Sequence, residues 1–193
     1  MDQNVLIKST SQVGMCPRKD DHVTRTFRIP IEFDESLRED AEAHGTSVNS
    51  LVIKILEKYN ESDRFFGQGQ YITFSPTTLT NMLKELDNEG VRKAGNESGN
   101  TVPRSRLLLK GMPINRTSTI KYITDIIGGY DDWFTCNHYE RKDHTLLHLR
   151  HVYDMKWSIF LEAYLTSMFI DLLDLDDIDF EITNASLTVR VPK

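Results

Sequence analysis

The chain has 193 residues, of which 39% are hydrophobic and 27% are charged, a profile typical of globular proteins and not of disordered ones. This length allows one large domain, or a small module joined to a larger domain. No apolar run approaches the roughly 20 residues that cross a bilayer, and the first residues lack the basic-then-apolar order of a signal peptide. Only Cys16 and Cys136 are present, too few for a disulfide framework, so we expect a cytoplasmic protein with no membrane partner.

The formal net charge of −6 excludes a protein that coats nucleic acid by bulk attraction. It does not exclude local contact with nucleic acid, because binding depends on the charge of one face of the protein. Residues 1–29 are locally basic, with five basic and three acidic side chains, whereas acidic side chains concentrate after residue 31. The charge pattern therefore favours an N-terminal segment for any contact with a polyanion.

The first part of the chain predicts an arm, one strand and one helix. Residues 1–22 are polar and show no sustained period, which is typical of a flexible arm. Residues 24–29 alternate incompletely between polar and apolar side chains and are closed by Pro30, as in a short strand. A helix is predicted over residues 31–44, and Gly45 is placed to end it. One face of that helix carries Phe33, Leu37 and Ala41.

A second predicted helix begins at Thr46 or Ser47, either of which can cap it, and runs to about Tyr59. Its apolar positions form a wide helical stripe: Val48, Leu51, Val52, Ile55, Leu56 and Tyr59. A lone strand leaves its backbone groups unpaired, and two short helices are too small to bury such a stripe. A second copy of the chain meets both needs, so we expect dimerisation to be part of folding.

The remainder of the chain predicts a polar linker and an α+β domain. The linker covers residues 60–70. The predicted elements that follow are a strand near 71–74, a helix near 76–88, a polar loop near 88–105, a helix near 117–128, a hairpin of 132–140 and 144–152, a helix over 154–173, and strands over 178–182 and 186–191.

Residues 24–59 resemble the ribbon-helix-helix proteins of the MetJ/Arc type. The resemblance is carried by the strand Thr24–Ile29, by Pro30 at the turn into the first helix, by the segment Gly45–Ser50 at the turn into the second, and by the spacing between them. It implies a fold in which an N-terminal ribbon-helix-helix, an intertwined dimer, precedes a larger C-terminal α+β domain. The domain limits are then an arm at 1–22, a DNA-binding domain at 23–60 and an oligomerisation or effector-sensing domain at 71–193.

The resemblance also implies which side chains meet DNA. The ribbon lies in the major groove, with Thr24, Thr26 and Arg28 toward the base edges, while Phe27 and Ile29 point into the core. Arginine can donate two hydrogen bonds to guanine, and threonine can contact a polar edge or the thymine methyl group.

A second contact is implied at the start of the second helix, where the backbone N–H groups of Ser47, Val48 and Asn49 can hold a DNA phosphate. The chain departs from the family pattern at Asp40, where an apolar residue is common, and in having few basic residues within the motif. Few phosphate contacts predict modest affinity for one dimer, and hence sites that hold two or more dimers side by side. Arg18 and Lys19 in the arm are placed to add contacts.

The C-terminal domain offers two weaker candidates. Cys136, His138, His148 and His151 lie close in sequence, but the alternation of strands puts His148 and His151 on opposite faces, so we expect no metal site. A ligand pocket lined by Trp157, His151 and Tyr164 is the alternative to simple core packing for the apolar surface of the last long helix.

The sequence thus predicts a prokaryotic, sequence-specific transcriptional regulator, most simply a repressor, that binds double-stranded DNA as a homodimer or tetramer, with a small-molecule effector as a further partner. No nucleophile elbow, phosphate loop or dinucleotide glycine pattern is present, so we expect neither an enzyme nor a cofactor. Two alternatives remain open. One is an antitoxin that sequesters a toxin protein, and the other is a ligand- or metal-binding protein that uses the ribbon only to dimerise.

Overall fold

The computed structural model describes residues 23–65 and 72–193. The chain divides into two compact units, and the boundary between them falls between Val48 and Asn49, in the first turn of the second helix. Each unit is described separately.

Helix α1 (Ile31–Ala43) forms where the sequence predicts it. Pro30 occupies the N-cap, and Glu32 and Asp34 lie in the first turn, where negative charge is favourable to the helix dipole. The helix ends at a left-handed residue, Gly45, whose φ is +60°. The N–H of Thr46 donates to the carbonyl oxygen of Ala41 at 2.9 Å, so the turn satisfies carbonyl groups that the helix would leave open.

Helix α2 (Val48–Glu61) is also confirmed, but it runs on into the predicted linker, and the short 3₁₀ helix η1 (Asp63–Phe65) follows it. The prediction of a polar linker over 60–70 is therefore wrong for residues 60–65, while residues 66–70 lie outside the described part. The reason lies in contacts made far along the chain. Ser62 is buried and donates to Asp131 at 3.1 Å, and the ammonium group of Lys110 donates to the backbone carbonyl of Glu61.

A predicted strand near 71–74 is not found among residues 72–74, and residue 71 lies outside the described part. Ile72 and Phe74 are exposed, and no strand of the described residues pairs with their backbone groups. The segment leads instead into α3 (Pro76–Lys84), whose N-cap Ser75 accepts a hydrogen bond from the N–H of Thr78.

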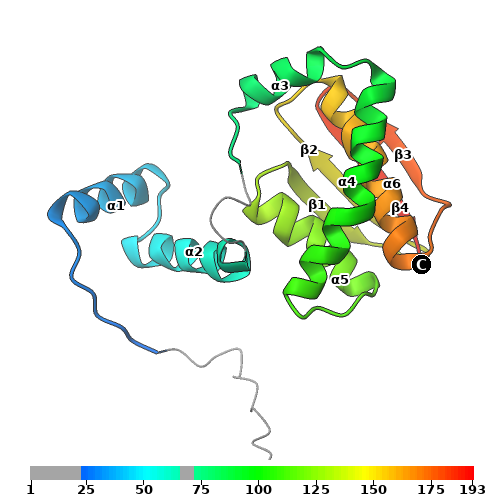
Figure 1. Ribbon diagram of the computed structural model, residues 1–193. Coiled ribbons are helices and arrows are strands. Elements are labelled where there is room, and N and C mark those ends of the chain that lie inside the picture. The colour runs from blue at the N-terminus through cyan, green and yellow to red at the C-terminus, as the bar shows by residue number, and fades with distance from the viewer. Residues whose placement is uncertain (1–22, 66–71) are drawn as a thin grey trace, which may run out of the picture. The chain divides into compact units, whose positions relative to one another are not determined.

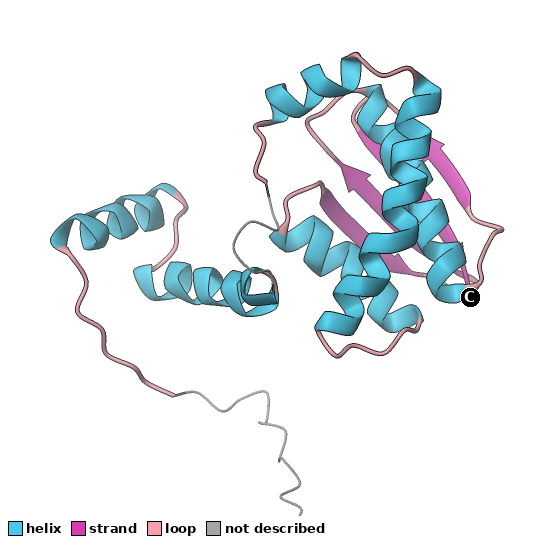
Figure 2. Ribbon diagram, viewed as in Figure 1, coloured by secondary structure: helices cyan, strands magenta, loops and turns pink. Residues whose placement is uncertain are grey.

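The rest of the second unit is an α+β domain, as predicted (Figures 1 and 2). Its elements are α4 (Asn88–Leu109), α5 (Arg116–Lys121), the π-helical segment η2 (Tyr122–Tyr130), β1 (Thr135–Glu140), β2 (His144–Arg150), α6 (Met155–Leu173), β3 (Asp179–Ile182) and β4 (Ser186–Pro192). The four strands form one antiparallel sheet in the order β1-β2-β4-β3. Helices α4 and α6 lie over one face of this sheet (Figure 1).

Helix α4 overturns the prediction of a polar loop near 88–105. Asp87 caps its start by accepting from the N–H of Gly90 at 2.7 Å. Gly95 and Gly99 are buried against α6, and a Cβ atom added at Gly99 would lie 2.1 Å from the carbonyl oxygen of Tyr164. The glycines that led to the prediction of a loop therefore allow two helices to pack closely.

The core lies between α6 and the inner face of the sheet. Alternate residues of the two central strands are fully buried there: Thr145, Leu147 and Leu149 from β2, and Leu187, Val189 and Val191 from β4. This alternation confirms the predicted hairpin and the last two strands.

Candidate nucleic-acid interface

The segment expected to form the DNA-reading ribbon is exposed in the single chain. Thr24, Thr26 and Arg28 all lie on the surface, and residues 23–30 have no assigned secondary structure. A strand is defined by hydrogen bonds to a neighbouring strand, and the expected neighbour belongs to a second copy. The ribbon therefore remains a prediction, compatible with a chain seen alone.

The apolar side chains of the same motif are uncovered. Phe27 is 70% exposed and Ile29 is 48% exposed, although both were predicted to point into a core. Over residues 31–61, Ala41 is the one buried residue of the two helices. The exposed apolar residues of these helices are Ile31, Phe33, Ile53, Ile55, Leu56 and Tyr59. By contrast, the C-terminal domain encloses a core of its own.

The predicted phosphate contact lies at the start of α2. Val48 is the first helical residue, Ser47 immediately precedes it, and Ser47 and Asn49 are exposed. In any α-helix the first N–H groups have no acceptor within the helix, and the dipole makes this end positive. No acidic residue lies in the first turn of α2, so no negative side chain of that turn opposes an anion there.

Two basic side chains, Arg25 and Arg28, lie in the segment expected to form the ribbon. Neither Arg25 nor Arg28 forms an ion pair with any side chain of residues 23–65 or 72–193. Arg38 differs, because its Nε donates to the carboxylate of Asp34 one helical turn away at 2.7 Å. Asp40 is exposed on the acidic face of α1. Arg18 and Lys19 lie outside the described residues.

The three residues proposed to line a ligand pocket pack into the core of the C-terminal domain. The rings of Trp157 and Tyr164 are buried among Trp133 and Phe160, and Trp157 stacks on Phe160 with ring centres 4.9 Å apart. The hydroxyl of Tyr164 lies 2.8 Å from that of Tyr122. Burial raises the pKa of both tyrosines.

His151, the third of those residues, is also buried. Its Nε2 lies 2.8 Å from the hydroxyl of Ser158, which itself donates to the carbonyl oxygen of Thr183. Burial lowers the pKa of His151 below its usual value, so the neutral form is favoured. A ligand pocket at these three residues remains a prediction.

The cysteine and the histidines of the hairpin do not converge. Cys136 and His138 are paired with the inward-facing Leu149 and Leu147, whereas His148 is paired with Asn137 on the other face of the sheet. Within the described ranges, no three metal-ligating side chains come close enough together to hold a metal ion. Burial raises the pKa of the Cys136 thiol to about 11, so it is protonated at neutral pH.

The structure also contains a cavity that the sequence did not predict. It has a volume of about 600 Å³ and lies between the α5–η2 segment and the edge strand β1. Its lining residues are Arg116, Thr117, Ile120, Lys121, Thr124, His138, Glu140 and Lys193. These residues are scattered over nearly 80 positions of the sequence, and no local motif marks them.

Comparison with known families supports the candidate nucleic-acid interface in the N-terminal part of the chain. Residues 17–59 match the family model of the Arc-like DNA binding domain. The match confirms the resemblance carried by residues 24–59 and indicates a DNA-binding domain in the N-terminal part of the chain. It stops inside α2 and leaves the α+β domain unassigned. The comparison with curated proteins gave no significant match. None of the helices in the described ranges combines the length and apolar character that a membrane span needs.

Proposed function

We propose that this protein is a sequence-specific transcriptional regulator that acts in the cytoplasm as a homodimer and represses by occupying promoter DNA. The uncovered apolar surface of the Arc-like segment is the observation that carries the proposal. Phe27, Phe33, Leu56 and Tyr59 are each more than half exposed in the single chain. Water contact over so many large apolar side chains is unfavourable, and a second copy of the same motif offers a matching surface.

In the proposed dimer, residues 24–29 of the two copies pair as an antiparallel ribbon. Thr24, Thr26 and Arg28 then face the major groove, while Phe27 and Ile29 enter the shared core, since side chains alternate along a strand. The Arg28 guanidinium, which has no acidic partner among the described residues, is available for a bidentate contact with guanine.

The start of α2 completes the proposed interface by binding a backbone phosphate through the N–H groups of Ser47, Val48 and Asn49. The net charge of −6 and the few basic residues of the motif limit the phosphate contacts of each dimer. Two dimers on adjacent half-sites, a tetramer on DNA, would compensate for this weakness.

The extent of the folded C-terminal domain favours a regulator over an antitoxin, whose toxin-binding tail is usually short and unstructured. A domain with its own core and sheet fits a role in oligomerisation or effector binding. We propose no catalytic role for it.

Selection of bound sequences from random double-stranded DNA with the full-length protein, at fixed salt, tests the function. Enrichment of short palindromic or tandem sites is the expected result. Arg28→Ala should lower affinity for the selected site by about 1–3 kcal/mol and relax selectivity at one base pair. Arg25→Ala is the matched control, because Arg25 lies on the opposite face of the ribbon and should affect all sequences alike. Absence of any enriched site, or equal loss of selectivity in both variants, contradicts the proposal.

A further inference from the structure

The cavity beside β1 is a separate feature of the C-terminal domain. Strand β1 is at the edge of the sheet, so its inner face is only partly covered. His138 and Glu140 lie on that inner face, because they pair with Leu147 and Thr145 of β2. The α5–η2 segment forms the opposite wall with Ile120, Lys121 and Thr124. A volume of about 600 Å³ lies within the range of pockets that hold metabolite-sized ligands.

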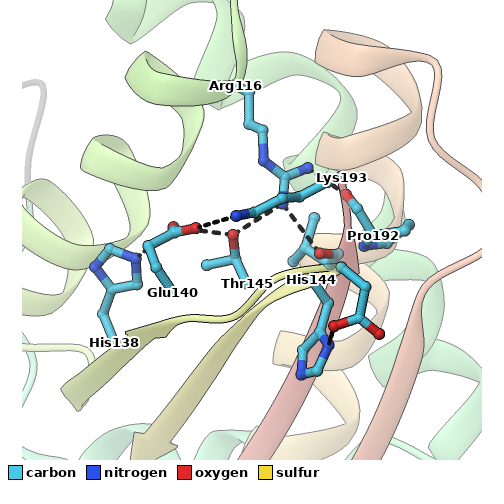
Figure 3. Close-up of polar contacts among 9 residues, drawn as sticks. Arg116, His138, Glu140, His144, Thr145, Pro192 and Lys193 are labelled. Carbon is cyan, nitrogen blue, oxygen red and sulfur yellow. Dashed lines mark hydrogen bonds and ion pairs between the residues drawn. The ribbon is translucent and has the colours of Figure 1, made fainter.

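Arg116 is held rigidly in this wall by neutral groups (Figure 3). Its Nη2 donates to the hydroxyl of Thr145 at 2.9 Å and to the carbonyl oxygen of Val191 at 3.0 Å, and its Nη1 donates to the carbonyl oxygen of Pro192. No carboxylate of the described residues pairs with this guanidinium. The half-buried charge is therefore fixed in position, and it has no counterion among the side chains that the structure describes.

Glu140, the acidic residue of the lining, is fully engaged elsewhere. It accepts from Nε2 of His138 and from the hydroxyl of Thr145, both at 3.0 Å, and it pairs with Lys193 at 3.3 Å (Figure 3). These contacts, led by the hydrogen bonds from His138 and Thr145, lower the pKa of Glu140 to about 2. The single negative charge thus neutralises Lys193 and not Arg116.

Lys121 adds a second cation, whose charge is felt by the carboxylate of Glu61. It is exposed, it lines the cavity five positions after Arg116, and it forms no ion pair with the side chains that the structure describes. The lining then holds three permanent cations, namely Arg116, Lys121 and Lys193, against one carboxylate. Ile120 provides apolar surface next to this charge, and Thr117 and Thr124 also line the cavity.

We infer that the cavity is a binding site for a small organic anion, with its negative group held by Arg116 and Lys121 and its apolar part against Ile120. A carboxylate or phosphate would supply the counterion that Arg116 lacks among the described side chains, and Lys121 would add its attraction. The fixed network of Arg116, Thr145 and Glu140 means that the site exists before the ligand arrives, which reduces the entropy lost on binding. The inference does not depend on DNA binding, since it concerns residues outside the Arc-like segment.

A nuclear magnetic resonance titration of the full-length, isotope-labelled protein tests the site. The probes are benzoate, succinate and inorganic phosphate, with benzamide as a neutral analogue of benzoate. We expect saturable shifts of the backbone amides around the cavity with benzoate, and none with benzamide. The amides to follow are those of Thr117, Ile120, Lys121, Thr124 and His138.

Two matched variants locate the binding. Lys121→Gln removes a cavity charge and should weaken the apparent affinity for benzoate about fivefold, as expected for loss of a partly exposed ionic hydrogen bond. Lys142→Gln makes the same change on the exposed β1–β2 turn, outside the cavity, and should leave the affinity unchanged. No saturable shift with any of the three anions, equal shifts with benzamide, or equal affinity of the two variants would overturn the inference.

Discussion

Truncation of Leu56 distinguishes a dimeric motif from a monomeric one. In the single chain this α2 side chain is 53% exposed, so about half of it is left for a partner to cover. Full burial of a leucine is worth about 1.5–3 kcal/mol, and covering the remaining half is then worth about 1 kcal/mol per copy. Two copies contribute to each dimer, so Leu56→Ala should weaken dimerisation by about 2 kcal/mol, or roughly 30-fold in the dissociation constant.

Sedimentation equilibrium over a wide range of protein concentration measures this constant. The matched control is Leu108→Ala, because Leu108 is 59% exposed and lies near the end of α4, outside the Arc-like segment. This variant should associate like the wild type. A wild-type protein that stays monomeric throughout, or two variants with the same association constant, would refute the reasoning.

Three further changes test other parts of the structure. Gly99→Ala should lower the unfolding free energy by about 2 kcal/mol and the melting temperature by about 4–8 °C, since the clash with a backbone carbonyl of α6 outweighs the better helix propensity of alanine. Gly90→Ala in the first turn of the same helix brings the new Cβ within 3.1 Å of the Asp87 carboxylate oxygen, a side-chain atom that can shift slightly, so it should cost much less than Gly99→Ala. The stability that Glu140 contributes is present above its ordinary pKa of 4.5 and is lost as the pH falls toward 2. The difference in melting temperature between wild type and Glu140→Gln should therefore shrink over that window, and a difference independent of pH would count against the assigned contacts. Lys110→Met should speed amide hydrogen exchange in the last turn of α2 by removing the partner of Glu61, and unchanged exchange there would show that the contact does not hold the helix end.

The spacing of apolar residues predicted the helices and strands in which these residues recur at a regular interval. Helices α1, α2 and α6 have apolar positions at helical spacing, and β2 and β4 alternate between core and solvent. The resemblance of residues 24–59 to ribbon-helix-helix proteins was confirmed by the family match.

Helix α4 was missed because its stabilising contacts are tertiary. Its glycines and asparagines have poor helix propensity, and Pro103 lies within it. The buried positions of this helix recur every four residues, at Val91, Gly95, Gly99 and Pro103. This spacing of mostly small residues was the one feature of the sequence that could have indicated a buried helix here. The cavity was missed for a related reason. Only the strand register brings His138 and Glu140 opposite the α5–η2 segment.

The attachment of α2 to the α+β domain limits how this chain can be divided. The family match ends at Tyr59, yet the helix continues to Glu61, where Lys110 binds its final carbonyl and Ser62 donates to Asp131. Asp131 is in turn paired with the buried Arg106. A chimaera that grafts the motif onto another protein at residue 59 would discard this whole junction, so a graft should extend beyond Phe65 and carry substitutes for the lost partners.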